Sequence, residues 1–386
     1  MWTESLRFTA IVAMVPLLLA CSSAPPGPAP AQKTEPAPAA KAPEPAKPAA
    51  QAPAPAQPPT APPQAQAPAP QAAPAGLKRG GTLTIGTLSS PRQLDPHRTA
   101  SADDYLHTFW MFNALTRILP DGKVVPDLAE SWKSSDDLTK WTFTLRKGVL
   151  FHDGRELNAE DVVASLKRVQ DPATGSIGRA QLAVIQGITA PDANTVELML
   201  NTPYSELPKA VGAIQAKIAP KDSFGSLSEK PVGTGPFKFA ELVVGDKIRV
   251  VRNDKYFVKD QPYLDEIVYR VFPEALVAAT ALRRGEIDIW YRVPPDQIKD
   301  LQRAGGEVVV EGAPTGSFDA VIVHNERKPF NDPKFRLALN YATDKQKVVD
   351  AAVFGFGTPV DAPIPPNSPV FRKDLPLRKQ DVAKAK

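Results

Sequence analysis

Few residues of this sequence belong to the types that perform covalent catalysis or hold a metal ion. The chain contains one cysteine, Cys21, and four histidines, His97, His107, His152 and His324. A single cysteine excludes an internal disulfide and a cysteine-rich metal cage. The histidines are scattered, and no two of them have the spacing of metal ligands on one element. We therefore expect no metal site.

The motifs of common enzyme classes are also missing. The sequence has no Gly-x-Ser-x-Gly elbow, no His-Glu-x-x-His pair and no phosphate-binding P-loop. His152 and Asp153 form the only adjacent histidine–aspartate pair, and the following Gly154 is typical of a turn. A hydrolase or another enzyme stays open as an alternative. The residue types favour a protein that binds its partner without a catalytic group and without a cofactor.

The balance of charges argues against a nucleic-acid partner. The 46 lysines and arginines nearly match the 42 aspartates and glutamates, which leaves a net charge of +4 over 386 residues. Nucleic-acid binding requires a concentrated basic face, and the part expected to fold contains no basic run. The sequence therefore predicts no nucleic-acid binding.

The first twenty residues have the pattern of an export signal. Arg7 precedes an apolar run from Phe8 to Leu19, which is too short to span a bilayer as a mature helix. The run ends in Leu18-Leu19-Ala20-Cys21, which resembles the bacterial lipobox. We therefore interpret residues 1–20 as a signal peptide and predict lipidation of Cys21. An incidental free cysteine is the alternative.

A segment of low complexity follows the cysteine. Residues 21–78 consist mostly of alanine, proline and glutamine, and no aromatic residue occurs among them. Such a composition cannot bury enough apolar surface to offset chain entropy. Its prolines favour extended polyproline II structure. We predict a disordered linker that lifts a folded domain off a membrane, and a ligand for a proline-recognition module is the alternative.

Strands and helices are mixed without strict alternation in the remaining chain. Trp141, Phe143 and Leu145 alternate with polar residues, as in a half-buried strand. Strands are predicted over 82–86, 141–145, 195–200, 237–240, 248–252, 267–272, 286–290 and 320–323. This mixture predicts α/β lobes with chain crossovers rather than a barrel.

Helix boundaries are marked by capping residues. Asn158 with Asp161 predicts a capping box ahead of a helix that stops at Asp171-Pro172. Gly285 is placed to end a helix over 274–284, and Asp332 followed by Pro333 predicts the start of another. Aromatic residues at helical spacing predict a further helix over 105–118.

Several motifs resemble, in order, one protein family: the extracellular solute-binding proteins of family 5, the dipeptide, oligopeptide and nickel type. The likeness begins near Gly80 and runs to the end of the chain. It rests on Gly81-Thr82-Leu83-Thr84-Ile85, Leu94-Asp95-Pro96, Pro126-Asp127-Leu128-Ala129-Glu130-Ser131-Trp132, Trp141-Thr142-Phe143-Thr144-Leu145-Arg146, Phe151-His152-Asp153-Gly154, Val232-Gly233-Thr234-Gly235-Pro236-Phe237, Gly285-Glu286-Ile287-Asp288 and Lys328-Pro329-Phe330-Asn331-Asp332. These residues are of structural types, so they indicate the family without indicating the ligand.

The resemblance implies a two-lobed α/β fold of the periplasmic-binding-protein kind (type II, Venus-flytrap) with an extra small domain. Lobe I is expected over 79–115 and 230–315, and the extra α/β domain over 116–229. Residues 316–386 are expected to begin the second ligand-binding lobe. Family members continue with a further segment, so the chain is expected to be a C-terminally truncated member of the family.

The resemblance also implies the function of a monomeric binding protein for an ABC importer. Such a protein captures a short peptide or a similar small solute in a cleft between its lobes. It then docks on permease subunits whose ATPases are separate chains. With the predicted lipid anchor at Cys21, it would be exported and attached to the periplasmic or outer face of the cell membrane. A surface lipoprotein without a transport role is an alternative.

The candidate cleft residues are aromatic and polar groups near the expected lobe junctions: Ser89, Ser90, Tyr105, Trp110, Trp290, Tyr291, Phe318 and Asn325. Ordinary core or surface positions are the alternative for each of them. The sequence leaves the solute open among peptides, nickel complexes, sugars and small amines. Because paired histidines, clustered thiols and an arginine cluster are missing, a bare transition metal or a polyphosphate is disfavoured.

Overall fold

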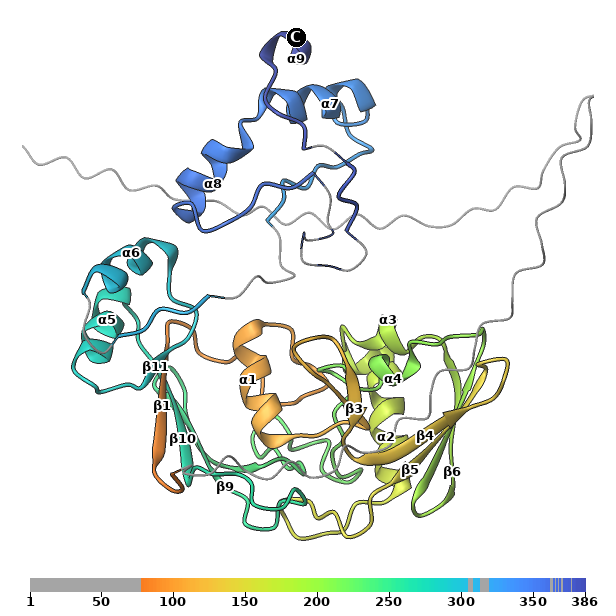
Figure 1. Ribbon diagram of the computed structural model, residues 1–386. Helices are drawn as coiled ribbons and strands as arrows, with labels where there is room; N and C mark the ends of the chain where they lie inside the picture. Colours follow the sequence, from red (N-terminus) through yellow and green to blue (C-terminus); the bar gives the residue numbers. More distant parts are fainter. Residues whose placement is uncertain are drawn as a thin grey trace, which may run out of the picture. The chain divides into compact units, whose positions relative to one another are not determined.

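A computed structural model describes residues 78–304, 308–312, 319–361, 364, 366, 368, 371–375 and 377–386. The predicted signal peptide, Cys21, nearly all of the predicted linker and Phe318 lie outside the described residues. Within the described ranges, helices and strands are mixed (Figure 1), and no helix there is long and apolar enough to cross a bilayer.

A five-stranded mixed sheet joins the first strand to strands from much later in the chain. Its order is β11-β1-β10-β9-β8, with β1 parallel to β10 and β11 and the remaining pairs antiparallel. The strands are β1 (Thr82–Thr87), β8 (Phe237–Val243), β9 (Lys247–Arg252), β10 (Glu266–Val271) and β11 (Ile289–Trp290). Ile85, Val250 and Ile267 of this sheet pack in one core with Met111 and Phe112.

A four-stranded antiparallel sheet has the order β4-β5-β7-β6. Its strands are β4 (Ala129–Ser134), β5 (Lys140–Leu145), β6 (Ile185–Asp192) and β7 (Thr195–Leu200), and a separate pair is formed by β2 (Thr116–Ile118) and β3 (Val124–Pro126). Strands β4 and β5 pair antiparallel, and β5 covers the strand predicted over 141–145. Trp141, Phe143 and Leu145 are buried while their neighbours are half-buried, as the alternation predicts.

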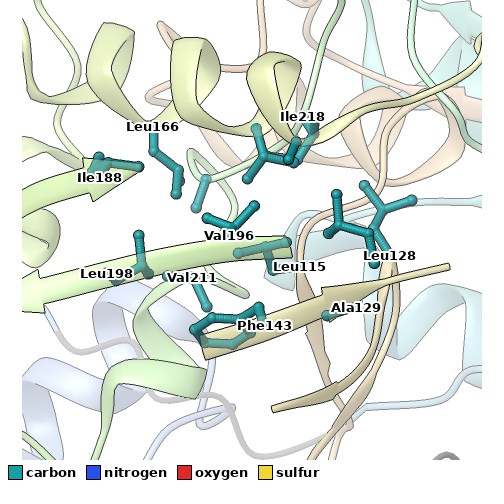
Figure 2. Close-up of a cluster of buried hydrophobic side chains, with 14 of the residues drawn as sticks. Leu115, Leu128, Ala129, Phe143, Leu166, Ile188, Val196, Leu198, Val211 and Ile218 are labelled. Atoms are coloured by element: carbon teal, nitrogen blue, oxygen red, sulfur yellow. The ribbon is translucent and has the colours of Figure 1, made fainter. Parts of the chain in front are cut away.

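Helix α2 (Ala159–Gln170) packs on β6 and β7 and closes the core of the four-stranded sheet. Its N-terminus has the predicted capping box, in which the Asn158 side chain accepts from the backbone of Asp161 and the Asp161 side chain accepts from that of Asn158. Figure 2 shows Leu166 pointing from this helix toward the strand that carries Val196 and Leu198. The helix is therefore held by its apolar face and started by its cap.

The other helices are shorter. They are α1 (Ala102–Met111), the 3-10 turn η1 (Pro172–Thr174), α3 (Arg179–Leu182), α4 (Leu207–Ala210), α5 (Ala275–Arg283), α6 (Pro295–Ala304), α7 (Pro333–Ala342), α8 (Lys345–Val353) and α9 (Val382–Ala385). Two predicted boundaries are confirmed. Gly285 follows α5 with a φ of +68°, and the Asp332 side chain accepts a hydrogen bond of 2.8 Å from the Lys334 backbone at the start of α7.

The predicted helix over 105–118 is wrong in its second half. Helix α1 ends at Met111, and Phe112 is already extended. The backbone beyond it is bonded to other segments: the Asn113 carbonyl accepts from Ile218, and the Ala114 amide donates to the Asp127 carboxylate. Tertiary hydrogen bonds thus replace the helical ones that the aromatic spacing suggested.

Two predicted buried strands also differ from the structure. The segment 320–323 has no strand, and Val321 and Ile322 are 92% and 93% exposed. A strand requires a neighbour for its backbone groups, and no described segment pairs with this one. The strand predicted over 286–290 is reduced to Ile289–Trp290, which pairs with Ile85 and Gly86 of β1.

The two larger sheets use the chain segments that were assigned to lobe I and to the extra domain. All strands of the five-stranded sheet lie within 79–115 and 230–315, and all strands of the four-stranded sheet lie within 116–229. Their roles as lobe and extra domain, and the start of a second lobe at residue 316, stay predictions.

Two glycines let the chain pass close to the end of α1. A Cβ atom on Gly233 would lie 2.0 Å from the Met111 carbonyl oxygen, and one on Gly235 would lie 2.4 Å from that of Trp110. Instead, the Gly235 amide donates a 3.0 Å hydrogen bond to the Met111 carbonyl. The segment before Pro236 therefore requires glycine for close approach.

A buried ionic network joins three segments. Arg168 of α2 donates to both carboxylate oxygens of Asp95, at 2.9 and 2.5 Å, and to Nδ1 of His97 at 2.7 Å. Because arginine only donates, His97 carries its proton on Nε2, which donates at 2.7 Å to the Lys217 carbonyl. Burial lowers the pKa of His97 to about 4, so the ring is neutral at neutral pH.

We expect Gly235→Ala to lower the free energy of unfolding by about 1–3 kcal/mol, because the added methyl group overlaps the end of α1. Gly225→Ala is the matched control, since a Cβ there meets nothing within 4 Å. Denaturant unfolding of both variants measures the difference. Equal stability of the two would contradict the close packing of this segment.

We expect Arg168→Met to cost about 3–5 kcal/mol of stability, because it leaves the carboxylate of Asp95, 1% exposed, without its cation. Arg252→Met removes a cation from the exposed pairs with Asp254 and Asp265. Its cost should stay within about 1 kcal/mol. Urea unfolding at pH 7.5 compares the two variants, and an equal loss in both would show that the network is not the stronger restraint.

Candidate functional site

A cavity of about 490 Å³ is lined by residues of α1, β2, α3 and the segment that follows α4. This volume lies within the range of roughly 300–1,000 Å³ that is common for small-molecule sites. A second depression, of about 540 Å³, has Arg168 in its wall. Arg168 is already bound to Asp95 and His97 there. The first cavity is therefore the better candidate, because it contains buried polar side chains with hydrogen-bonding capacity left for a ligand.

The rim of this cavity is apolar and exposed. Phe109, Ile118 and Ile177 line it, and they are 50%, 37% and 56% exposed. Tyr105 lies one turn before Phe109 on the same face of α1 and also lines the cavity. Exposed apolar side chains gathered around one hollow are typical of a binding site.

The floor of the cavity is a polar pair within an apolar stretch. Gln215 and Lys217 are each only 5% exposed, and both line the cavity. Hydrogen bonds fix both residues. The Gln215 side-chain amide donates to the Thr99 carbonyl at 3.1 Å, and His97 donates to the backbone carbonyl of Lys217. The ionic network around Arg168 therefore also positions the floor.

Glycine brings this floor against β2. A Cβ on Gly212 would lie 2.6 Å from Oγ1 of Thr116 and 3.0 Å from its carbonyl oxygen. Thr116 is followed by Arg117 and Ile118, which also line the cavity. Close approach at Gly212 thus holds the segment after α4 against β2.

The electrostatics of the cavity are one-sided. Its lining contains Arg117 and Lys217 and no carboxylate. The Lys217 ammonium lies 5.0 Å from the centre of the Phe109 ring, as in a cation–π contact. Burial lowers the pKa of Lys217, and the nearby charge of Asp127 opposes that change. Burial likewise raises the pKa of Asp127, against the charge of Lys217.

Of the residues predicted from the sequence to bind ligand, Tyr105 lines this cavity. Ser89 is exposed, Ser90 is half-buried, and both follow β1. Trp110 packs edge-on against Tyr269 with ring centroids 6.0 Å apart. Ser89, Ser90 and Trp110 are not in the lining of the cavity. A role in binding stays a prediction for these three, as it does for Trp290, Tyr291, Phe318 and Asn325.

The later candidates are dispersed. Trp290 is 6% exposed, and its indole nitrogen has no hydrogen-bond partner among the described residues. Tyr291 donates its backbone amide to Gly86 at 2.9 Å, which extends the pairing of β11 with β1. Asn325 is exposed. Phe318 lies outside the described residues.

The sequence interpretation missed the floor of the cavity. Lys217 and Gln215 occur within Ala210–Ala219, a stretch that is otherwise apolar and ends before Pro220. Two polar residues in such a run could have indicated a binding site, because lysine is rarely buried unless it is paired. Phe109 was predicted only as part of an aromatic helix face.

Comparison with known proteins places the chain in a family. Residues 123–386 match the model of "Bacterial extracellular solute-binding proteins, family 5 Middle". The chain is 30% identical over 301 residues to a probable D,D-dipeptide-binding periplasmic protein, DdpA, of Escherichia coli. That alignment covers 73% of this chain and 57% of the relative, so the chain spans little more than half of the relative's length.

Solved structures agree with this assignment. The periplasmic binding protein DppA of Helicobacter pylori, in complex with the peptide STSA, superposes with a TM-score of 0.71 at 28% identity, covering 80% of this chain and 65% of that one. AgaA of A. tumefacien R10, in complex with agropinic acid, gives a TM-score of 0.68 at 30% identity, covering 79% and 63%. The likeness confirms the predicted fold class, the two-lobed α/β fold of periplasmic binding proteins. The chain belongs to the bacterial extracellular solute-binding proteins of family 5.

Proposed function

We propose that this chain is the solute-binding component of an ABC importer, and that it captures short peptides or similar small solutes and delivers them to a membrane permease. The observation that carries this proposal is a 490 Å³ cavity with an apolar rim and a buried polar floor, in a chain of family 5. Apolar walls with a few placed polar groups are what a small-solute site requires.

The proposed mechanism is capture without chemical change. A solute in the cavity contacts Tyr105 and Phe109 of α1 and the floor at Gln215. In the predicted two-lobed trap, a second lobe closes over the solute, and the extra contacts stabilise the closed form. That form docks on permease subunits, whose separate ATPases supply the energy. None of these steps needs a nucleophile or a cofactor.

Peptides are the solute class that the relatives favour. The names of the Escherichia coli and Helicobacter pylori proteins refer to a D,D-dipeptide and to a bound peptide. Other relatives are named for glutathione and heme. A cavity with amide and hydroxyl groups beside aromatic rings suits a peptide, because such groups bind backbone amides while the rings contact side chains.

Calorimetry with the full chain tests this function. We expect heat from one or more di- to pentapeptides, and none from a nickel–histidine complex or cello-oligosaccharides. No peptide should be hydrolysed. Phe109→Ala should weaken peptide binding about tenfold through lost apolar contact. Val244→Ala, at an 84% exposed position outside the cavity, should not weaken it.

Tight binding of sugar or nickel with no peptide heat would overturn the assignment to peptides and leave an importer receptor. Turnover of a peptide would favour an enzyme on the same scaffold. Binding of none of these solutes would favour a surface lipoprotein without a transport role.

We also propose that Cys21 is lipidated and anchors the exported protein to the periplasmic or outer face of the cell membrane. The apolar run before Cys21 and the proline-rich segment after it support this proposal. Cys21→Ser should move the protein from the membrane fraction to the soluble fraction of bacterial extracts. Equal distribution of wild type and variant between the two fractions would contradict anchoring.

A further inference from the structure

Lys217 is a buried cation that faces a cavity without a bonded partner. Lys217 as a whole is 5% exposed. Its ammonium group makes no hydrogen bond or ion pair with any described residue. The ammonium group lies 5.0 Å from the centre of the Phe109 ring. A lysine side chain with so little exposure is uncommon in proteins unless it is paired. The protein therefore holds a cation at the floor of the cavity that no described carboxylate contacts directly, although the charge of Asp127 acts on it.

Asp127 is the carboxylate whose charge acts on Lys217, but its oxygens are bonded to other groups. Asp127 is buried, and its two carboxylate oxygens accept from Nδ2 of Asn113 at 2.9 Å and from the Ala114 amide at 3.1 Å. The charge of Asp127 acts on Lys217, but no hydrogen bond or ion pair joins the two side chains in the described fold. Asp127 fixes the turn after α1, whereas Lys217 keeps its hydrogen-bonding capacity for another group.

The surroundings of Lys217 also favour an anion. Arg117 also lines the cavity, and it is exposed and has no hydrogen bond or ion pair with a described residue. Gln181 and Gln215 add amide groups to the lining, and no aspartate or glutamate occurs in it. A zwitterionic solute would therefore place its negative end here.

We infer that Lys217 is the specificity-determining residue of this cavity and that it binds a carboxylate of the solute, with Arg117 attracting the same group at the mouth. The inference rests on the proposed function in assuming that this cavity holds the solute, and it adds the chemical class of the group recognised. A carboxylate suits one buried ammonium group, whereas a phosphate needs several converging donors. The carboxylate comes from the end of a peptide or from an acidic side chain.

Matched peptides test the inference. Calorimetry compares one tripeptide with a free C-terminus, its C-terminal amide, and an amide that carries one glutamate. We expect amidation to weaken binding to the wild type at least tenfold. Partial recovery by the glutamate would assign the carboxylate to a side chain as well as to the terminus. Lys217→Met should bind the free and amidated peptides equally. Lys209→Met, exposed on α4, should retain the wild-type preference.

Small anions separate this inference from the peptide assignment. At constant ionic strength, succinate should raise the melting temperature of the wild type, and succinamide should not. Lys217→Met should lose the response. If no peptide binds but succinate acts through Lys217, the peptide assignment fails and the carboxylate site stands. If peptides bind equally with and without a carboxylate, the site fails and the peptide function stands.

Two further results would overturn the inference. One is stabilisation by inorganic phosphate, but not by succinate, that depends on Lys217. The other is an unchanged carboxylate preference in folded Lys217→Met. If Lys217→Met does not fold, the carboxylate preference of Arg117→Gln tests the inference instead. The Arg117 side chain is exposed and lies outside the core, so this variant should fold. It should reduce the carboxylate preference two- to fivefold, and an unchanged preference would count against the site.

Discussion

The contact of Arg168 with Asp95 and His97 joins three parts of the chain that are distant in sequence. Arg168 belongs to α2, Asp95 and His97 follow β1, and the imidazole of His97 holds the Lys217 carbonyl. The loop after the first strand, the helix on the four-stranded sheet and the floor of the cavity are therefore coupled. Because Asp95 is almost completely buried, the network must remain fully paired.

Close backbone approach is the second constraint, and it acts on the same region. Gly233 and Gly235 lie against the last carbonyl groups of α1, and Gly212 lies against Thr116 of β2. Helix α1 supplies Tyr105 and Phe109 to the cavity, so fixing its C-terminal end also fixes the apolar rim. The motif around Gly235 that identifies the family thus has a physical role, which is to hold the helix that lines the cavity.

The cavity combines an apolar entrance with an unbalanced charge. Proteins usually bury a lysine only with a partner, and the described fold leaves the ammonium of Lys217 beside an aromatic ring. An incoming anionic group would gain strongly from such a preorganised charge, since little rearrangement is needed. Recognition at Lys217 would account for selectivity among solutes, even though the scaffold is shared with relatives whose names refer to different ligands.

The sequence by itself determined the family, the fold class and most local elements. Capping at Asn158 and alternation at Trp141, Phe143 and Leu145 are set by neighbouring residues, so local patterns suffice to predict them. Tertiary structure decided where α1 ends, because hydrogen bonds to Ile218 and Asp127 replace its last turns.

The cavity likewise needed the tertiary structure. Tyr105 and Lys217 are more than a hundred positions apart, and no local pattern states that they line one hollow. The burial of Lys217 without a bonded partner also depends on which segments surround it. Spacing along the chain fixes a residue's own element, whereas the neighbours of a side chain are fixed only when distant elements pack.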